Sequence, residues 1–273
     1  MMNNTGDKVR VIIVGASGRM GRMLVRAVTE SPSTVLVAAT ERSGSAFLTR
    51  DAGELAGVET LGVRLVDDIE TCAEADVIID FTAPVATLAH ARYAANHDVA
   101  MVIGTTGFTP EQMLQLQDVL SNSSVVMAAN YSVGVNLALN LIEKAAQVLG
   151  NDYDAEIYEA HHKHKVDAPS GTALAMAKSL AAGRGVNLDD VAVLSREGIT
   201  GARKPGTIGF SVVRGGNIVG EHQAMFIADE ERIEISHNAS DRMVFARGAV
   251  RAAGWLSDQS SGWYDMQNVL SLN

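Results

Sequence analysis

A run of β-branched residues near the start of the chain leads directly into a glycine-rich turn, and no other feature restricts the possible folds as strongly. The run is Val9–Val14, and the turn has the sequence G-A-S-G-R-M-G over Gly15–Gly21. The next residues predict a helix, because Met20, Leu24 and Val28 fall on one face at helical spacing. A strand, a glycine turn and a helix in this order are typical of the first unit of an open parallel sheet.

The spacing of the glycines matches a dinucleotide-binding loop, in which the turn approaches a pyrophosphate and the last glycine lets the helix pack on the strand. Ser17 stands where the middle glycine of the usual pattern would be. The glycines alone also fit an ordinary strand-to-helix turn, so the prediction of a dinucleotide-binding loop depends on the strand that follows. Val35–Thr40 predicts that strand, and Glu41 at its end can accept hydrogen bonds from ribose hydroxyls, which favours NADH.

Two arginines near this acidic residue favour the other cofactor. Arg42 follows Glu41 directly and Arg19 lies in the glycine turn, where either guanidinium could pair with a 2′-phosphate. Both arginines could instead be ordinary surface charges. Because Glu41 and Arg42 favour opposite cofactors, we expect both NADH and NADPH to be accepted.

Further along the chain, predicted strands and helices alternate, as a parallel sheet requires. The additional strands are Val77–Asp80, Val99–Ile103 and Val125–Ala129, and the helices are Val85–His97 and Pro110–Leu120. Small polar residues follow these strands at Thr82, Gly104-Thr105-Thr106 and Ala129-Asn130-Tyr131. Ligands of such sheets lie at the carboxyl ends of the strands, so we expect these loops near a nicotinamide ring.

The pattern changes near residue 133. Helices are predicted at Val135–Leu149, from Ser170 to about Ala182 and at Met243–Leu256, and strands at Asp154–His161, Val191–Leu194, Thr207–Val213, Asn217–Ile227 and Arg232–His237. We therefore predict an α/β chain with an N-terminal Rossmann-like dinucleotide-binding domain, formed by residues 1–132 and 241–273. A second α+β domain built on a mixed open sheet would occupy residues 133–240 and bind the substrate.

Three histidines and two lysines occur within five residues, His161–Lys165 (H-H-K-H-K), in a chain whose net charge is −10. Pro169 and Ser170 then predict a helix start, where free backbone N–H groups bind carboxylates or phosphates. Histidine transfers protons near neutral pH, and lysine stabilises negative charge. The segment therefore predicts acid catalysis on an anionic substrate. If the preceding strand continued to Lys165, His161 and Lys165 would share one face and His162 the other.

Three segments together resemble the 4-hydroxy-tetrahydrodipicolinate reductase (dihydrodipicolinate reductase) family: Gly15–Gly21 with Glu41-Arg42, Gly104–Phe108, and E-A-H-H-K-H-K-V-D-A-P-S-G-T-A over Glu159–Ala173. The resemblance runs over nearly the full length, and the last segment is highly specific. It implies NAD(P)H-dependent reduction of 4-hydroxy-tetrahydrodipicolinate to tetrahydrodipicolinate in lysine and diaminopimelate biosynthesis. It also implies a homotetramer assembled through the sheet of the second domain. The chain departs from the family at Ser17, where some members have glycine, and at Lys163, often an arginine.

The same resemblance implies roles for individual residues. His161 would donate and accept the proton, and Lys165 would be the second catalytic group. His162 and the backbone of Ser170, Gly171 and Thr172 would bind carboxylates, so the expected ligand is a small dicarboxylate. The cofactor would contact Gly15, Ala16, Ser17, Gly18, Arg19, Met20, Glu41, Arg42, Gly104, Thr105, Thr106, Ala128, Ala129, Asn130 and Tyr131.

Other functions fit parts of the sequence. A zinc site at His161, His162 and His164 is disfavoured because the interleaved lysines would repel the cation and no cysteine is near, so no metal is expected. A reductase of another imino acid, resembling aspartate dehydrogenase, would use the same residues, and turnover of ammonia with oxaloacetate would reveal it. A dinucleotide-binding redox sensor would need no proton donor, so His161→Ala would leave its function intact.

Length and composition agree with a two-domain enzyme. The chain has 273 residues, of which 47% are hydrophobic, enough for a sizeable core. No run approaches a membrane span, and the N-terminal residues lack the apolar segment of a signal peptide, which predicts a cytoplasmic protein. The acidic net charge argues against a nucleic-acid partner. The one cysteine, Cys72, excludes an internal disulfide and lies in a stretch expected to be helical, Asp68–Ala75.

Overall fold

The computed structural model describes residues 8–272, and the chain divides into two compact units. The first unit contains the described residues up to Val133 together with Met243–Ser271. The second contains Gly134–Arg242 and Leu272. Each unit has its own sheet and its own hydrophobic core.

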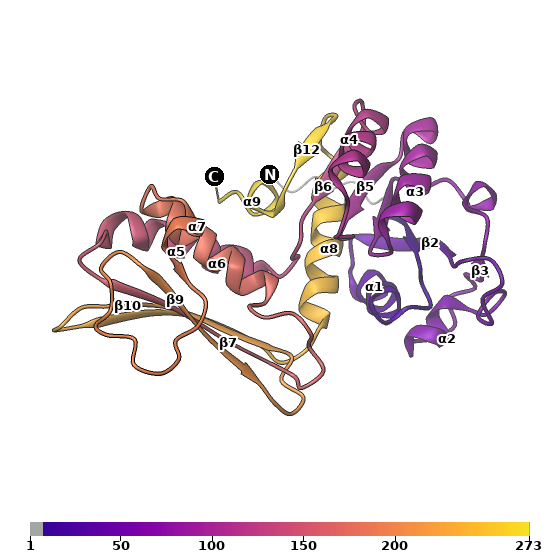
Figure 1. Cartoon of the computed structure of the whole chain (residues 1–273). Helices are drawn as coiled ribbons and strands as arrows, with labels where there is room; N and C mark the ends of the chain where they lie inside the picture. Colours follow the sequence, from indigo (N-terminus) through magenta and orange to yellow (C-terminus); the bar gives the residue numbers. More distant parts are fainter. Residues whose placement is uncertain (1–7, 273) are drawn as a thin grey trace. The chain divides into compact units, whose positions relative to one another are not determined.

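The first unit is built on a parallel sheet of seven strands in the order β12-β6-β5-β4-β1-β2-β3 (Figure 1). The strands are β1 (Val9–Val14), β2 (Thr34–Thr40), β3 (Leu65–Val66), β4 (Val77–Asp80), β5 (Ala100–Ile103), β6 (Ser124–Met127) and β12 (Gly262–Tyr264). Most residues of strands β1, β4 and β5 are buried and apolar, as expected for strands covered on both faces. Their carboxyl ends all lie at one edge of the sheet.

Helices cover both faces of this sheet because successive side chains of a strand point in opposite directions. Val11 and Ile13 of β1 pack on the side of α1 (Arg19–Glu30) and α8 (Met243–Leu256). Ile12 and Val14 pack on the side of α3 (Pro84–His97) and α4 (Pro110–Val119). The remaining short helices of this unit are α2 (Ala52–Ala56), the 3₁₀ turn η1 (Ile69–Thr71) and α9 (Met266–Leu270).

The second unit is built on a mixed five-stranded sheet in the order β11-β10-β7-β9-β8. The strands are β7 (Asp154–His161), β8 (Ala192–Val193), β9 (Ile208–Arg214), β10 (Gly220–Ile227) and β11 (Arg232–Ala239). The helices are α5 (Val133–Leu149), α6 (Gly171–Gly183) and α7 (Leu188–Val191). Figure 1 shows α5 and α6 on one face of the sheet, and their apolar residues share a buried cluster with Ile157 and Phe226.

The pairing of β7 with β9 positions the site described below. These two strands are parallel, and their register places His161 opposite Arg214 at the ends of both strands. On the other side of β7, strand β10 is antiparallel, with His222 opposite Glu159. Since side chains directly opposite each other lie on the same face, Glu159, His161, Arg214 and His222 all lie on the face covered by the helices.

The predicted fold class is confirmed, with small shifts at the ends of most elements. The boundaries of β1, β7 and α8 coincide with the predicted ranges. The helical stretch expected over Asp68–Ala75 is wrong: only Ile69–Thr71 form a 3₁₀ turn, because Cys72 adopts an extended backbone that leads toward β4. No local sequence pattern predicted α2, β3, α7, β12 or α9, all of five residues or fewer.

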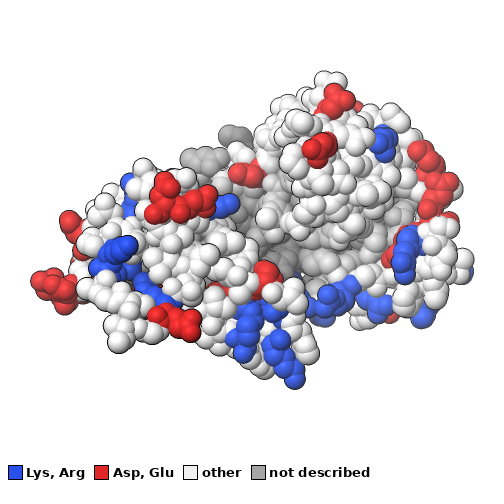
Figure 2. All heavy atoms as spheres, in the orientation of Figure 1, with Lys and Arg blue, Asp and Glu red and all other residues white. Residues whose placement is uncertain are grey.

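No helix within residues 8–272 is both long and apolar enough to cross a bilayer. Figure 2 shows acidic and basic side chains interspersed over the face in view. The net charge of −10 is therefore not gathered into a single patch on that face.

Candidate active site

The glycine loop between β1 and α1 has the shape of a phosphate cradle. Gly15 has a φ of +66°, a conformation that favours glycine. A Cβ added at Gly21 would lie 2.2 Å from the carbonyl oxygen of Gly15, and one at Gly18 would lie 3.2 Å from the same atom. The glycines therefore let the loop close tightly on the start of α1, whose first N–H groups favour anions. These residues fit the pyrophosphate of a dinucleotide.

Glu41 lies beside this loop, at the end of β2, and its carboxylate is already held in place. Oε2 accepts hydrogen bonds from the Ser17 backbone N–H at 3.1 Å and from the Ser17 hydroxyl at 2.5 Å. Oε1 accepts one from the Arg42 backbone N–H at 3.0 Å. Burial alone would raise the pKa of Glu41, but the hydrogen bonds from Ser17 and Arg42 outweigh it and lower the pKa below its ordinary value. The carboxylate stays ionised and keeps lone pairs for a ribose hydroxyl.

The loops that follow β4 and β5 are joined by a buried network around Asp80, which the sequence analysis did not identify. Asp80 is fully buried, and its Oδ1 accepts hydrogen bonds from the backbone and hydroxyl of Thr82 and from the hydroxyl of Thr105. Its Oδ2 lies 2.7 Å from Nδ1 of His90. The Thr105 hydroxyl also accepts a hydrogen bond from Thr87. The Thr105 side chain therefore belongs to the scaffold, which leaves its backbone for a cofactor.

Tyr131, also expected at the cofactor, is buried in the same way. Its hydroxyl lies 2.9 Å from the carbonyl oxygens of both Ile103 and Val126, and its ring lies 5.3 Å from that of Phe81. Burial raises the pKa of this phenol. The Tyr131 side chain thus fastens β5 to β6, and only its backbone stays available. Gly104 packs on the Phe81 ring so closely that a Cβ would lie 2.1 Å from it.

The other residues expected to bind the cofactor follow the ends of β1, β2, β5 and β6. Ala16 is buried, and its N–H bonds the carbonyl of Thr40, which fixes the glycine loop to β2. Asn130 accepts a hydrogen bond from the Ser132 backbone N–H at 2.9 Å. Arg19, Met20, Thr106, Ala128 and Ala129 lie on the segments after β1, β5 and β6, Arg42 lies after β2, and all six are at least partly exposed.

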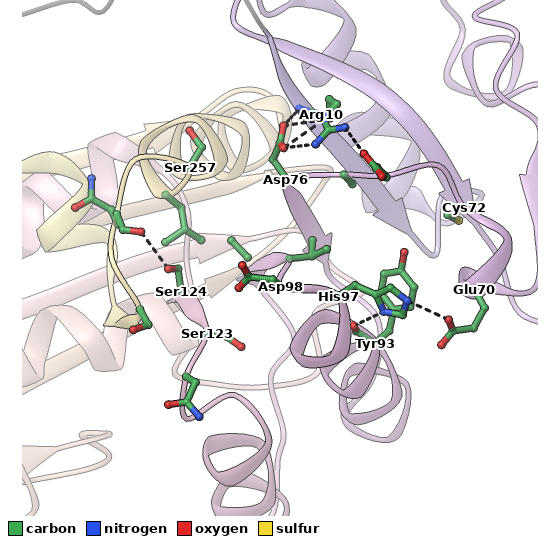
Figure 3. A pocket seen from close by; sticks show the side chains of 18 residues that line it. Arg10, Glu70, Cys72, Asp76, Tyr93, His97, Asp98, Ser123, Ser124 and Ser257 are labelled. Atoms are coloured by element: carbon green, nitrogen blue, oxygen red, sulfur yellow. Dashed lines mark hydrogen bonds and ion pairs between the residues drawn. The ribbon is translucent and has the colours of Figure 1, made fainter.

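A separate cavity of about 820 Å³ lies at the opposite edge of this sheet, where the strands begin (Figure 3). Most of its charged residues bond one another. Arg10 pairs with Asp76 at 2.8 Å and with Glu74 at 3.3 Å. His97 lies 3.5 Å from Glu70 and stacks on Tyr93 at a centroid distance of 4.1 Å. This edge therefore differs from the one where parallel sheets bind their ligands.

In the second unit, strand β7 ends at the first residue of the histidine cluster. His161 is nearly buried, and its Nδ1 lies 2.6 Å from Oε2 of Glu159, two residues earlier on the same face of the strand. The chain then turns, because Lys165 N–H bonds the carbonyl of His162 and His162 N–H bonds that of Ile218. The strand therefore does not continue to Lys165, and the bend required for His161 and His162 to act together is present.

Glu159 connects this histidine to three other parts of the unit. Its two oxygens accept hydrogen bonds from both terminal nitrogens of Arg214, each at 2.8 Å. Oε1 also accepts one from the backbone N–H of Ser170 at 2.9 Å. Arg214 in turn donates to the carbonyl of Asp167. Arg214 could not be identified from the sequence, because only the register between β7 and β9 brings it beside Glu159.

Lys165 and His162 have partners of their own in the turn. Nζ of Lys165 lies 2.9 Å from Oδ1 of Asp167, and this hydrogen bond lowers the pKa of Asp167. A terminal nitrogen of Arg242 lies 3.3 Å from Nε2 of His162. Desolvation and the charge of Arg242 lower the pKa of His162, so this ring is neutral at pH 7 and its proton lies on Nδ1. Arg242, another cation near the turn, was not identified from the sequence.

The start of α6 partly fits the predicted carboxylate site. Ser170 caps the helix, since its hydroxyl accepts a hydrogen bond from the Ala173 N–H at 3.2 Å. Its backbone N–H is bonded to Glu159 and is therefore not available to a substrate, contrary to the prediction. Gly171 is exposed, and a Cβ added there would meet no atom within 4 Å. Of the three residues predicted to bind a carboxylate through their backbone, Gly171 and Thr172 are therefore the two that form the first turn of α6.

A fourth histidine, distant in sequence, belongs to this cluster. His222 of β10 is buried, and its Nε2 lies 3.0 Å from the hydroxyl of Ser170. Its ring packs edge-on against that of His161, at a centroid distance of 5.0 Å. Burial, with His161 nearby, lowers the pKa of His222 to about 4. His222 therefore lines the site as an uncharged side chain at pH 7.

The three histidines of the turn do not converge on one point. His161 bonds Glu159 and His162 bonds Arg242, while the rings of His162 and His164 have centroids 6.3 Å apart. Within residues 8–272, no three His, Cys, Asp or Glu side chains are arranged to hold a metal ion.

Comparisons with known proteins agree with the two-unit architecture. Residues 9–131 match the model of the N-terminus of dihydrodipicolinate reductase, and residues 134–270 match that of its C-terminus. The 4-hydroxy-tetrahydrodipicolinate reductase of Psychrobacter arcticus is 53% identical over 266 residues, covering 97% of this chain and 96% of the relative. That of Burkholderia vietnamiensis is 53% identical over 265 residues, covering 97% and 100%.

A solved structure has the same fold. The dihydrodipicolinate reductase of a Paenisporosarcina species, solved with dipicolinate bound, superposes with a TM-score of 0.73 at 24% identity and covers 96% of this chain and 99% of its own. Two matching family models that together span nearly all of the described residues, with relatives at 53% identity, establish the relationship. The chain belongs to the dihydrodipicolinate reductase family.

Proposed function

We propose that this protein reduces 4-hydroxy-tetrahydrodipicolinate to tetrahydrodipicolinate, using NADH or NADPH, in lysine and diaminopimelate biosynthesis. The observation that carries this proposal is the fixed His161, whose Nδ1 is bonded to the buried Glu159 beside a turn rich in cations. Family membership supports the same reaction, because the relatives at 53% identity carry that name.

The reaction adds one hydride to a ring carbon and one proton where enamine-like negative charge develops, and the 4-hydroxyl leaves as water together with a hydrogen from the adjacent ring carbon. A bound reduced nicotinamide would supply the hydride. Gly15–Met20 and Glu41 with Arg42 would hold its adenosine end. The backbone of Gly104–Thr106 and Ala128–Tyr131 would line its ring.

The proton is the part of the reaction that this chain supplies. Because Glu159 accepts from Nδ1 of His161, Nε2 is the ring nitrogen left to hold or release a proton at the substrate. Lys165 would stabilise the negative charge that develops during hydride transfer. Asp167, its partner at 2.9 Å, keeps the ammonium near the turn until a dianionic substrate competes for it.

The substrate carboxylates would bind at the start of α6 and in the turn. Gly171 and Thr172 would offer backbone N–H groups and the positive end of the helix. His162 would donate from Nδ1, a buried ring nitrogen without a hydrogen-bond partner in the described part of the chain. Arg242, which bonds the other nitrogen of His162, adds positive charge next to it.

The test is loss of reduced-nicotinamide absorbance with 4-hydroxy-tetrahydrodipicolinate generated in place from pyruvate and aspartate semialdehyde. Wild type should turn over, and His161→Ala and Lys165→Ala should each lower kcat by about 10²-fold to 10⁴-fold. Lys178→Ala, on the exposed side of α6, is the matched control and should retain full activity. Turnover of ammonia plus oxaloacetate instead would contradict the proposed substrate.

We further propose that the protein is a homotetramer assembled through the face of the second sheet that α5 and α6 leave uncovered. Met225 lies on that face at the centre of β10, where it alternates with the buried Ala224 and Phe226. Met225→Lys should lower the molar mass measured by light scattering, whereas Ile199→Lys, in an exposed loop, should not. An unchanged mass in Met225→Lys would exclude this face as the interface.

A further inference from the structure

Every hydrogen-bonding position of the Glu159 carboxylate is filled. Oε1 accepts from the Ser170 backbone N–H at 2.9 Å and from Arg214 at 2.8 Å. Oε2 accepts from His161 Nδ1 at 2.6 Å and from Arg214 at 2.8 Å. A carboxylate offers about four such positions, and this side chain is fully buried. Glu159 therefore has no atom left for a substrate.

These four hydrogen bonds also determine the charge of Glu159. Arg214 and the Ser170 N–H can only donate, so a protonated carboxyl would place its own hydrogen against a donor. Burial alone would raise the pKa of Glu159, but the hydrogen bonds from Arg214, His161 and Ser170 outweigh it and lower the pKa. Glu159 is thus an anion, and an anion facing Nδ1 of His161 requires the proton of the neutral ring to be on that nitrogen.

The other ring nitrogen of His161, Nε2, lies beside Gly220, which has no side chain to block it. A Cβ added at Gly220 would lie 3.2 Å from Nε2 of His161. No hydrogen bond to Nε2 is present among the described residues, and the His161 side chain is 11% exposed. With Nδ1 committed to Glu159, Nε2 is left as the single position at which this ring can exchange a proton.

The same carboxylate ties the histidine to the anion-binding helix start. Ser170 caps α6, and Arg214 reaches the backbone carbonyl of Asp167, the residue whose carboxylate pairs with Lys165. The Glu159 side chain therefore contacts both His161 and the start of α6, and through Arg214 it is linked to the segment that carries Lys165. These contacts come from three separate parts of the chain, in β7, β9 and α6.

We propose that Glu159, held by Arg214, is a positioning residue that fixes the Nδ1–H form of His161 and locks it to the start of α6. This inference rests on the proposed function, in which His161 exchanges the proton with the substrate. Glu159 would act only through His161 and Ser170, because it has no free acceptor position.

The test compares Glu159→Gln with Glu156→Gln in the full-length protein. Glutamine keeps the size of the side chain but presents an NH₂ group to partners that only donate. We expect kcat of Glu159→Gln to fall at least about 100-fold, while KM for the reduced nicotinamide stays within about twofold. Glu156 also lies on β7 and pairs with Arg196 and Arg203, without contact to His161, so Glu156→Gln should retain wild-type kcat.

The spectroscopic signature is the protonation of the His161 ring. In ¹⁵N-histidine-labelled wild type, long-range ¹H–¹⁵N correlations should show Nδ1 protonated, with signals assigned by their loss in His161→Gln. Glu159→Gln should shift the ring toward the Nε2–H form, and Glu156→Gln should not. Retained kcat in Glu159→Gln would overturn the proposal, as would a fall in kcat with the Nδ1–H form unchanged.

A second variant keeps the proposal testable if Glu159→Gln does not fold. Arg214→Lys retains a positive charge beside Glu159 but replaces the paired hydrogen bonds by one. It should lower kcat by about tenfold and weaken the Nδ1–H signal, and an unchanged kcat and signal would contradict the proposal. Failure of the proposed function would look different: wild type itself would not reduce the substrate, whereas the ring signals are measured without turnover.

Discussion

Ser17 donates two hydrogen bonds to the same carboxylate oxygen of Glu41, from its backbone N–H at 3.1 Å and from its hydroxyl at 2.5 Å. A residue at the centre of the glycine loop thus aims the acidic side chain at the end of β2. Glycine at this position would keep the backbone bond and lose the hydroxyl bond. Ser17 therefore gives this chain a more firmly oriented Glu41 than a glycine would.

Glu41→Ala should weaken use of NADH and largely retain use of NADPH. The change removes a charged acceptor for ribose hydroxyls, which corresponds to ~1.5–3 kcal/mol or about a tenfold or greater rise in KM for NADH. Arg42→Ala is the reciprocal variant and should weaken NADPH more than NADH. Steady-state KM for each cofactor checks both, and equal losses for the two cofactors would show that Glu41 does not contact the ribose.

Stability should fall as the pH drops below about 6.5, partly because of His222. Its pKa in the folded protein is about 4, below the value of about 6.5 in an unfolded chain, so the unfolded state takes up the proton first. The stabilisation is fully present above pH 6.5, is lost as the pH falls toward 4, and amounts to about 3 kcal/mol.

The check is denaturant unfolding of wild type and His222→Gln between pH 7 and pH 4. Glutamine can accept the Ser170 hydrogen bond and does not titrate in this range. Other groups facing His222, namely His161, Glu159, His237 and Lys165, are retained in both proteins. The unfolding free energy of the variant should change less with pH than that of wild type. Parallel curves would refute the assignment to His222.

Gly248→Ala should destabilise the first unit by about 1–3 kcal/mol or more. A Cβ added there would lie 1.7 Å from the carbonyl oxygen of Tyr131, and neither α8 nor this backbone atom can move without disturbing the sheet. Gly254 lies on the same helix, and a Cβ there would meet only the Ser33 hydroxyl at 3.9 Å. Gly254→Ala should be neutral or stabilising by up to about 1 kcal/mol, because alanine favours a helix. Thermal unfolding measures both, and similar losses in the two variants would be inconsistent with the steric explanation.

Asp80→Asn should lower both stability and affinity for the reduced nicotinamide. The carboxylate is fully buried and accepts from Thr82, Thr105 and His90, so an amide would leave at least one donor unpaired at a cost of about 1–3 kcal/mol. The loops carrying Thr82 and Thr105 would then be held less firmly at the strand ends. Asp98→Asn, at an exposed left-handed position that asparagine tolerates, is the control and should change little.

Calorimetry of cofactor binding separates the two effects in Asp80→Asn. Weaker binding with a lower melting temperature would agree with a network that organises the rim. Wild-type affinity in a destabilised variant would show that Asp80 serves stability alone.

Local patterns predicted the main strands and helices because apolar periodicity reflects burial within a single element. The boundaries of β7 and α8 were predicted correctly from such patterns. Short elements such as β3 and β12 were missed, since two or three residues cannot show a period and depend on a neighbouring strand for their hydrogen bonds.

The residues of the candidate site also divide into those that a local sequence pattern predicted and those that it could not predict. His161, Lys165 and Ser170 were found because they lie close together in a distinctive segment. Arg214 and His222 were not, because they lie 55 and 63 residues beyond Glu159 and reach it only through strand pairing. The prediction that the Ser170 N–H binds substrate failed for the same reason, since its bond to Glu159 depends on how α6 docks on β7.

The parallel register that sets His161 opposite Arg214 also limits where the chain can change in length. One residue added within β9 would turn Arg214 to the opposite face of the sheet and leave the buried Glu159 without its counter-ion. Residues added before β9, in the exposed loop around Ile199, would leave that alignment unchanged. Natural length variation, and any tag or domain inserted by design, should therefore be tolerated in this loop and rejected in the strand that follows it.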